Sequence, residues 1–150
     1  MSILGLNLQR GQLRGCVLDG TKAAPNLVGK ERLVLDPSMS APHKMRWYED
    51  NLNALHGKYG FTGVAYRLHY SVNQTQATDL IMPLGVLNLF CNNSNIPISE
   101  FIAQNVTALK LGLPKGSNLY GACDSILGSH APYWDKVQKD AALVAWMVLP

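Results

Sequence analysis

The chain has 150 residues, of which 47% are hydrophobic and only 15% are charged. This length and apolar content suit one domain, residues 1–150, that buries a core of its own without disulfide or metal staples. The net charge of +3 permits a polyanionic partner such as nucleic acid but does not require one. Composition alone therefore leaves the class of function open.

The sequence shows no pattern typical of membrane insertion or export. Its longest strongly apolar runs, 80–91 and 141–149, are shorter than the roughly 18 residues that a membrane-spanning helix needs. Residues 1–10 alternate like a strand and lack the basic start and cleavage site of a secretory signal. The three cysteines are widely spaced in apolar surroundings, which indicates buried free thiols in a reducing compartment. We expect a cytoplasmic protein without a membrane segment.

The first sixty residues predict three strands and a helix. Two short apolar runs are separated by a polar stretch that contains Gly11, a spacing typical of an antiparallel hairpin. A third run ends at Asp36-Pro37, because proline cannot donate to a strand ladder. Apolar residues at intervals of three and four then indicate a helix, and Pro42 suits its first turn. The expected elements are strands at 3–8, 13–18 and 32–35 and a helix at 43–58.

The remaining residues predict strands that alternate with helices. The segment from about 76 to 91 has the length and apolar load of a long helix, in which Pro83 either produces a kink or marks a later start. A short apolar segment at 106–111 precedes a turn-rich stretch. This order suits an α/β layer fold with a mixed sheet. The other expected elements are a strand at 61–66, a short strand within 96–102 that carries Ile98, a helix at 119–127 and an apolar helix at 135–149.

Three local sequences resemble parts of one known family. They are Ile3-Leu4-Gly5-Leu6-Asn7 in the first strand, Val64-Ala65-Tyr66-Arg67 in the fourth strand and Asp140-Ala141-Ala142-Leu143 in the last helix. Together with the order of the elements, they resemble the RuvC family of junction-cutting nucleases in the RNase H-like superfamily. The resemblance implies an α/β fold with an RNase H-like mixed sheet, three antiparallel strands followed by parallel strands, flanked by helices. It also implies a homodimer that binds branched or duplex DNA.

The resemblance implies a nuclease site at which two of the family's carboxylates are missing. Such nucleases use two Mg²⁺ or Mn²⁺ ions, and hard ions of this kind require several carboxylate oxygens. Asn7 takes the place of an aspartate and Arg67 that of a glutamate, so Asp140 is the one matching carboxylate. The positions of the acidic residues support this loss of ligands. No Asp or Glu precedes Asp19, and only Asp79 lies between positions 50 and 100. For Asp79 we expect a structural role near a helix N-terminus.

Arg67 opposes a metal rather than merely failing to bind one. A unit positive charge about 4 Å from a divalent ion costs about 8 kcal/mol at an effective dielectric constant of about 20. We therefore hypothesise that Arg67 occupies the vacated metal position and pairs with Asp140. The alternative is that Arg67 points to solvent and Asp140 is an exposed acid. Asn7 is either native or an engineered replacement, and Asp140 is the expected ligand only if a metal binds at all.

The resemblance also implies a surface for nucleic acid. The stretch 106–117 is similar to the family's segment after the fifth strand, where basic residues approach the DNA backbone. Contacts of this kind are directed at phosphates and are sensitive to salt. The candidate nucleic-acid contacts are Arg67, His69, Lys110 and Lys115.

Three functions remain open on this sequence. The first is a RuvC-like domain that binds branched or duplex nucleic acid with lost or impaired two-metal nuclease activity, and it requires no cofactor. The second is an active structure-specific endonuclease of the Holliday junction type, with Mg²⁺ or Mn²⁺. The third is a non-catalytic oligomeric interaction protein on an RNase H-like scaffold. We expect a homo-oligomer, most simply a dimer.

Overall fold

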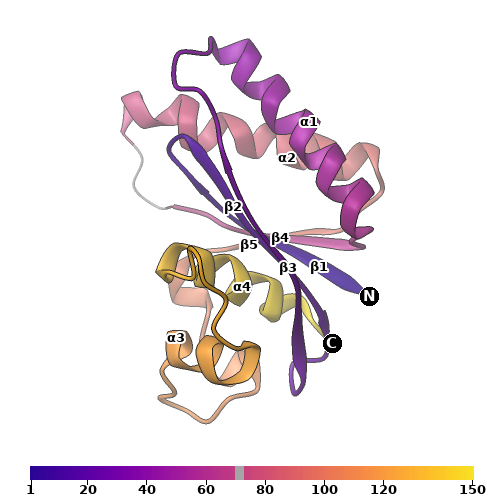
Figure 1. Cartoon of the computed structure of the whole chain (residues 1–150), viewed down its shortest axis with the longest axis vertical. Coiled ribbons are helices and arrows are strands. Elements are labelled where there is room, and N and C mark those ends of the chain that lie inside the picture. Colours follow the sequence, from indigo (N-terminus) through magenta and orange to yellow (C-terminus); the bar gives the residue numbers. More distant parts are fainter. Residues whose placement is uncertain (70–72) are drawn as a thin grey trace.

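A computed structural model describes residues 1–69 and 73–150 of the chain. Three strands open the fold, and strands and helices follow one another after them (Figure 1). The strands are β1 (Ser2–Gln9), β2 (Gln12–Gly20), β3 (Pro25–Val34), β4 (Gly63–Arg67) and β5 (Ile98–Phe101). The α-helices are α1 (Ala41–Tyr59), α2 (Met82–Asn93), α3 (Leu119–Ala122) and α4 (Lys136–Val148).

The five strands form one mixed sheet in the order β3-β2-β1-β4-β5. β1 pairs with β2, and β2 with β3, in antiparallel fashion, whereas β1 and β4, and β4 and β5, are parallel. The expected RNase H-like mixed sheet is therefore confirmed. Because β1, β4 and β5 run in the same direction, their carboxyl ends lie at one edge of the sheet.

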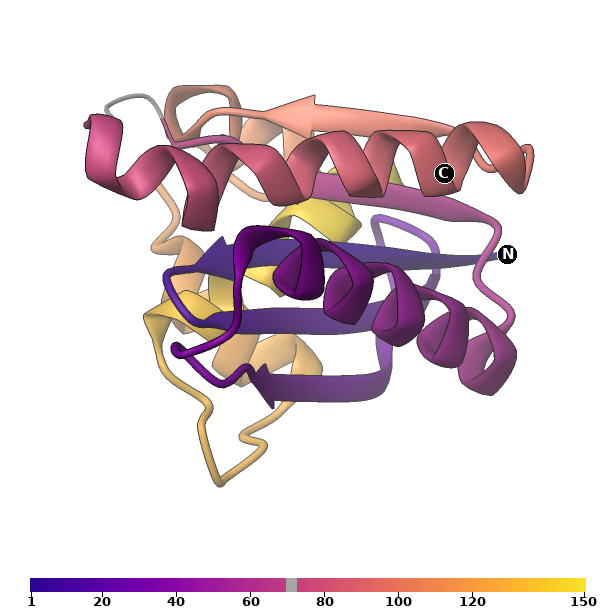
Figure 2. The ribbon, with the colours of Figure 1, turned by 90° about the horizontal axis from the view of Figure 1, so that it is seen from above.

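Helices cover both faces of the sheet, with α1 and α2 over one face and α4 over the other (Figure 1 and Figure 2). The alternation of side chains along β1 explains both cores. Leu4 and Leu6 belong to the core under α1 and α2, whereas Ile3 belongs to the core under α4. A Cβ on Gly5 would lie 1.9 Å from the carbonyl oxygen of Ala141. Glycine at this position therefore lets α4 pack closely on β1.

Most elements begin within two residues of the expected positions, and two begin further away. The third strand starts at Pro25 and not at 32, because β3 is an edge strand whose half-exposed polar residues interrupt the apolar pattern. Pro83 marks a later helix start, one of the two expected outcomes, because a 3₁₀ turn and a π-helical turn precede α2. Proline is tolerated there, since a helix leaves its first N–H groups unpaired. The expected helix at 119–127 consists of α3 and a π-helical turn.

The three cysteines are buried free thiols, as the sequence predicts. Burial raises the pKa of Cys16 to about 12 and that of Cys91 to about 11. Neither side chain is therefore a thiolate near neutral pH. In the part of the chain that the structure describes, no helix is both long enough and apolar enough to cross a membrane.

Candidate functional site

Four of the expected site residues meet at the carboxyl edge of the sheet. Asn7 and Arg67 lie on β1 and β4, each one residue beyond the last pair that joins these parallel strands. His69 lies two residues after the end of β4, and Asp140 lies in α4, which packs on β1 through Gly5. The sheet and one helix thus bring together residues that are far apart in the sequence.

The side-chain amide of Asn7 is buried and uses both of its polar atoms. Nδ2 donates to the carbonyl oxygen of Val137 over 3.1 Å, in the first turn of α4. Oδ1 accepts from Nε2 of Gln9 over 3.0 Å and lies 3.1 Å from Nε2 of His69. A carboxylate at this position could not donate to Val137. The nitrogen of Asn7 therefore has a structural use that an aspartate would not provide.

Arg67 pairs with Asp140 between β4 and α4. Nη1 of Arg67 lies 2.5 Å from Oδ1 of Asp140, and the hydroxyl of Tyr120 donates to the same oxygen over 2.9 Å. The side chains of Arg67 and Asp140 are only 23% and 13% exposed. The pair that we hypothesised from the sequence is present, and the alternative of a solvent-directed Arg67 with an exposed Asp140 is wrong.

Burial is the main influence on the pKa values of Asp140 and Tyr120. Burial raises the pKa of Asp140 above its ordinary value, and Arg67, Tyr120 and His69 act in the opposite direction. Burial, followed by the hydrogen bond to Asp140, also raises the pKa of Tyr120. Asp140 is thus a buried acid whose charged form depends on one guanidinium and one hydroxyl.

A cavity of about 220 Å³ opens beside the Arg67–Asp140 pair. Its walls come from the end of β4, the segment after β5, α3 and α4, and most of its lining is apolar. The polar lining residues are Arg67, Tyr120 and Asp140, and the apolar ones are Ala103, Val106, Leu119, Leu143 and Val144.

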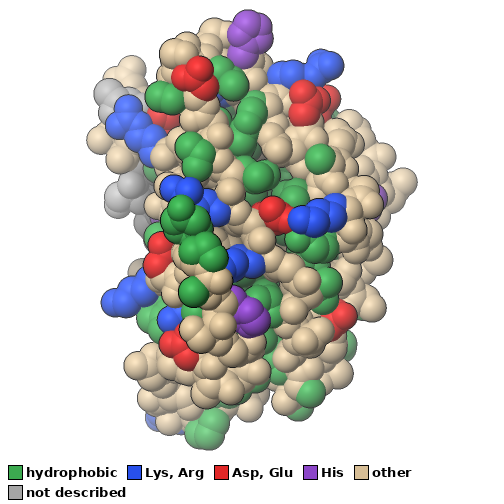
Figure 3. Space-filling model, viewed as in Figure 1, with side chains coloured by type: hydrophobic (Ala, Val, Ile, Leu, Met, Phe, Trp, Pro, Cys, Tyr) green, Lys and Arg blue, Asp and Glu red, His purple; other side chains and the backbone are tan. Residues whose placement is uncertain are grey.

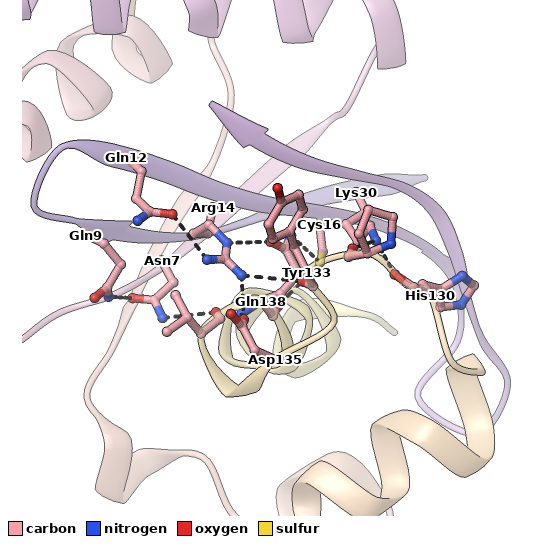
Figure 4. Close-up of polar contacts among 12 residues, drawn as sticks. Asn7, Gln9, Gln12, Arg14, Cys16, Lys30, His130, Tyr133, Asp135 and Gln138 are labelled. Carbon is pink, nitrogen blue, oxygen red and sulfur yellow. Dashed lines mark hydrogen bonds and ion pairs between the residues drawn. The ribbon is translucent and has the colours of Figure 1, made fainter. Parts of the chain in front are cut away.

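A second arginine reaches α4 on the other side of Asn7 (Figure 4). Arg14 on β2 lies opposite Asn7, and its side chain is only 5% exposed. Its Nε donates to Oε1 of Gln138 over 2.8 Å, and Nη2 pairs with Asp135, the N-cap residue of α4. The fully buried Gln138 donates in turn to the carbonyl oxygen of Gly15 over 2.6 Å. This network fixes the first turn of α4 against β2.

Sequence reasoning missed this network and Tyr120. Arg14 is in phase with the buried Cys16 of the same strand, so the alternation of β2 turns it inward. Asp135, three residues before Gln138, matches the capping pattern that precedes an apolar helix. These signals could have found the network. No comparable pattern marks Tyr120.

The structure does not bring Lys110 and Lys115 together with the other candidates. Lys110 lies in the 3₁₀ turn that follows β5, and Lys115 borders a separate cavity beside Leu109. Neither lysine lines the cavity at Arg67. On the face shown in Figure 3, basic side chains lie among acidic ones. A role of these lysines in binding nucleic acid stays a prediction.

The residues at this edge do not fit a pair of divalent ions. Asp140 is the only carboxylate among the candidates, and its Oδ1 is held by Arg67 and Tyr120. Asp79 pairs with Lys44 over 3.0 Å, which lowers its pKa and agrees with a structural role. Within residues 1–69 and 73–150, no three His, Cys, Asp or Glu side chains lie close enough together to hold a metal ion. Hard divalent ions require more oxygen ligands than this arrangement offers.

Comparison with solved structures identifies the fold. No protein-family model matches the chain, and no curated protein matches its sequence. RuvC of Thermus thermophilus in complex with a Holliday junction substrate matches with a TM-score of 0.80 and 17% identity, over 98% of this chain and 91% of that chain. The yeast mitochondrial Holliday junction resolvase Ydc2 matches with a TM-score of 0.69 and 15% identity, over 97% and 77% of the two chains. The chain therefore has the RuvC-like form of the RNase H-like fold.

Proposed function

We propose that this chain binds branched or duplex nucleic acid and that its two-metal nuclease activity is lost or impaired. The Arg67–Asp140 ion pair at the carboxyl edge of β1 and β4 carries this proposal. A guanidinium in contact with the one available carboxylate opposes the approach of a divalent ion. A RuvC solved with a Holliday junction is among the proteins of this fold, which supports nucleic acid as the partner. The residues at this edge are thus better suited to binding than to cleavage.

Arg67 and His69 are the residues that we propose to contact the nucleic acid. Asp140 holds Nη1 of Arg67, and because the Arg67 side chain is still 23% exposed, a phosphate oxygen can approach the guanidinium. His69 offers a second polar group beside Asn7. Contacts of this kind release counterions, so the affinity falls as the salt concentration rises.

Gel shifts and cleavage assays on the same four-way junction test the proposal. We expect salt-sensitive binding in EDTA as well as in Mg²⁺, and no cleavage with Mg²⁺ or Mn²⁺. Cleavage would instead support an active structure-specific endonuclease. A chain that neither binds nor cleaves would support an oligomeric interaction protein.

A single substitution tests the proposed phosphate contact. Arg67→Gln should weaken junction binding and reduce the slope of log affinity against log salt by about 1. Arg46→Gln removes the same charge from an exposed position on α1, and we expect little change there. Equal effects of the two substitutions would contradict a specific contact by Arg67.

Restoring the missing acids tests whether positions 7 and 67 correspond to metal-ligand positions of the RuvC family. Asn7→Asp with Arg67→Glu places two carboxylates beside Asp140, and we expect Mn²⁺ to bind and to raise the melting temperature. Asn53→Asp with Arg46→Glu changes charge equally on the exposed surface of α1 and serves as the control. If the restored variant gains no more from Mn²⁺ than the control, these positions do not correspond to the family's metal site.

We also propose that the chain forms a homodimer. Large exposed apolar side chains occur together at the start and along the length of α2, namely Ile81, Met82 and Leu89. Leu89→Lys should shift the mass in solution toward a monomer, whereas Ile126→Lys, at an apolar residue exposed elsewhere, should not. Light scattering after size-exclusion chromatography measures this, and a monomeric wild-type chain would overturn the proposal. A cytoplasmic location stays a prediction.

A further inference from the structure

The cavity beside the Arg67–Asp140 pair has two chemically different parts. Apolar side chains such as Val106, Leu119 and Val144 form most of its surface. The ion pair lies at its polar side, where Arg67 and Tyr120 both use Oδ1 of Asp140. Arg67, Tyr120 and Asp140 all line the cavity, so their polar groups are within reach of a ligand that enters it. The cavity thus combines apolar walls with a carboxylate and a guanidinium at one side.

We infer that this cavity binds a single unstacked nucleobase of the nucleic acid, an inference that rests on the proposed function. Proteins that hold an unstacked base place its faces between apolar or aromatic side chains and bind its edge through hydrogen bonds. Carboxylates accept from the amino groups of bases, and arginine donates to their ring nitrogens and carbonyl oxygens. Asp140 and Arg67 supply this combination at one end of an apolar cavity.

The size and charge of the cavity favour a base over other ligands. A volume of about 220 Å³ is below the range of about 300–1,000 Å³ that is typical for drug-sized ligands. A free phosphate inside the cavity would meet apolar walls and the Asp140 carboxylate, which offsets the charge of Arg67 there. Lys136 lies outside, with its Nζ 5.6 Å from the centroid of the Tyr120 ring. Its charge is suitably placed for the phosphate of the nucleotide whose base enters the cavity.

Filling the cavity gives a direct test. Ala103 lines the cavity but is itself exposed, so Ala103→Phe obstructs the entrance at little cost to the fold. Val106→Phe, from a half-buried position, fills it independently. Ala23→Phe is the control, because this exposed residue lies between β2 and β3, at the opposite end of the sheet.

The readout is the fluorescence of 2-aminopurine placed, one position at a time, around the crossover of a four-way junction. On saturation with wild-type chain we expect increased emission at one position at least, because the base leaves its stack. Both filled variants should lose this increase and bind the junction roughly tenfold more weakly, while the Ala23→Phe control keeps both properties. An increase that persists in the filled variants at saturation would overturn the inference.

Two further measurements separate the possible failures. Saturation-transfer NMR with free cytidine and guanosine shows whether the cavity takes a free nucleoside. Nucleoside binding that Ala103→Phe abolishes, without any cavity-dependent 2-aminopurine signal, would assign the cavity to a small molecule and overturn the inference for nucleic acid. Gel shifts on the same samples report whether the junction binds at all. A wild-type chain that gives no shift would overturn the proposed function, and this inference with it.

Discussion

Two arginines extend from the sheet to helix α4, and each pairs with an acid there. The two pairs differ in which partner is buried. Arg14 on β2 is 5% exposed, whereas its partner Asp135 is 53% exposed. Arg67 on β4 is 23% exposed, whereas its partner Asp140 is 13% exposed. The cation is buried in the first pair and the acid in the second, although both pairs join the same helix to the same sheet.

The pKa values of the two acids show what this difference does. The hydrogen bond from Arg14 holds the pKa of Asp135 below its ordinary value, because the carboxylate gains a cation and keeps its contact with water. Burial raises the pKa of Asp140 in spite of Arg67. The Arg14 pair therefore fixes the helix, whereas the Arg67 pair holds a buried acid next to an accessible guanidinium. A ligand can reach the second pair without disturbing the first.

Gly5→Ala should have the largest effect on stability, because it acts on both pairs at once. Its Cβ would meet the carbonyl oxygen of Ala141, so α4 must move away from β1 and from both arginines. We expect a loss of about 3 kcal/mol in the free energy of unfolding. Gly57→Ala in α1 is the control, since its Cβ meets nothing within 4 Å. It should stabilise the helix by up to about 1 kcal/mol.

Urea unfolding monitored by circular dichroism measures both glycine variants. A Gly5→Ala chain as stable as wild type would show that α4 does not depend on close contact with β1. The two arginine pairs would then not share a dependence on the packing of α4 against β1.

Arg14→Met should have the next largest effect. It leaves Oε1 of the fully buried Gln138 without its donor, and an unsatisfied buried acceptor costs about 2 kcal/mol. Arg10→Met is the matched control, because Arg10 pairs with Asp79 at 66% exposure and should contribute no more than about 1 kcal/mol. Chemical unfolding compares the two. Equal losses would show that the burial of Arg14 gives it no special role.

Arg67→Met should cost less in stability and more in binding. Asp140 keeps its hydrogen bond from Tyr120 and can take up a proton, so we expect a loss of about 1 kcal/mol at pH 7 and less at pH 5. Junction affinity should fall, whereas Arg14→Met should leave it unchanged under conditions in which that variant is folded. A larger loss of stability in Arg67→Met than in Arg14→Met, together with weaker junction binding by Arg14→Met, would contradict the separate roles of the two pairs.

The sequence predicts the Arg67–Asp140 pair better than the Arg14–Asp135 pair. Arg67 and Asp140 stand in two short sequences that resemble motifs of the RuvC family, and the apolar patterns around them predict a strand and a helix. Arg14 occurs in a strand where a charged residue usually faces water. Alternation with Cys16 turns its side chain inward, but its partners Gln138 and Asp135 are more than a hundred residues away in the sequence.

The order of the strands and helices was predictable from the sequence, but not all of their first and last residues were. Strong apolar runs located β1, β2 and α4, whereas the edge strand β3 carries polar residues from Pro25 onward and escaped the pattern. The cavity and Tyr120 escaped for another reason. They depend on how the turns between β5 and α4 pack on the sheet, and residue periodicity contains no information about that packing.

The smallest expected effect is on the pH dependence of stability, and it distinguishes Asp135 from Asp140 directly. The folded-state pKa of Asp135 is lowered, so its contribution is present above the unfolded value of about 3.9 and is lost as the pH falls through the folded value. The folded-state pKa of Asp140 is raised. Its contribution is full below about pH 3.9 and is lost as the pH rises through the folded value.

Asp135→Asn and Asp140→Asn should therefore change the pH profile in opposite directions. Relative to wild type, Asp135→Asn should be least stable at pH 7 and should recover as the pH falls, because the wild-type chain then loses the contribution of the Asp135 carboxylate. Asp140→Asn should compare most favourably with wild type at pH 7, where the wild-type acid is ionised at a cost, and less favourably toward pH 3. Urea unfolding of the three chains between pH 3 and pH 7 measures these differences. Parallel profiles for the two variants would mean that burial does not distinguish the acids, and Arg67 would then be as purely structural as Arg14.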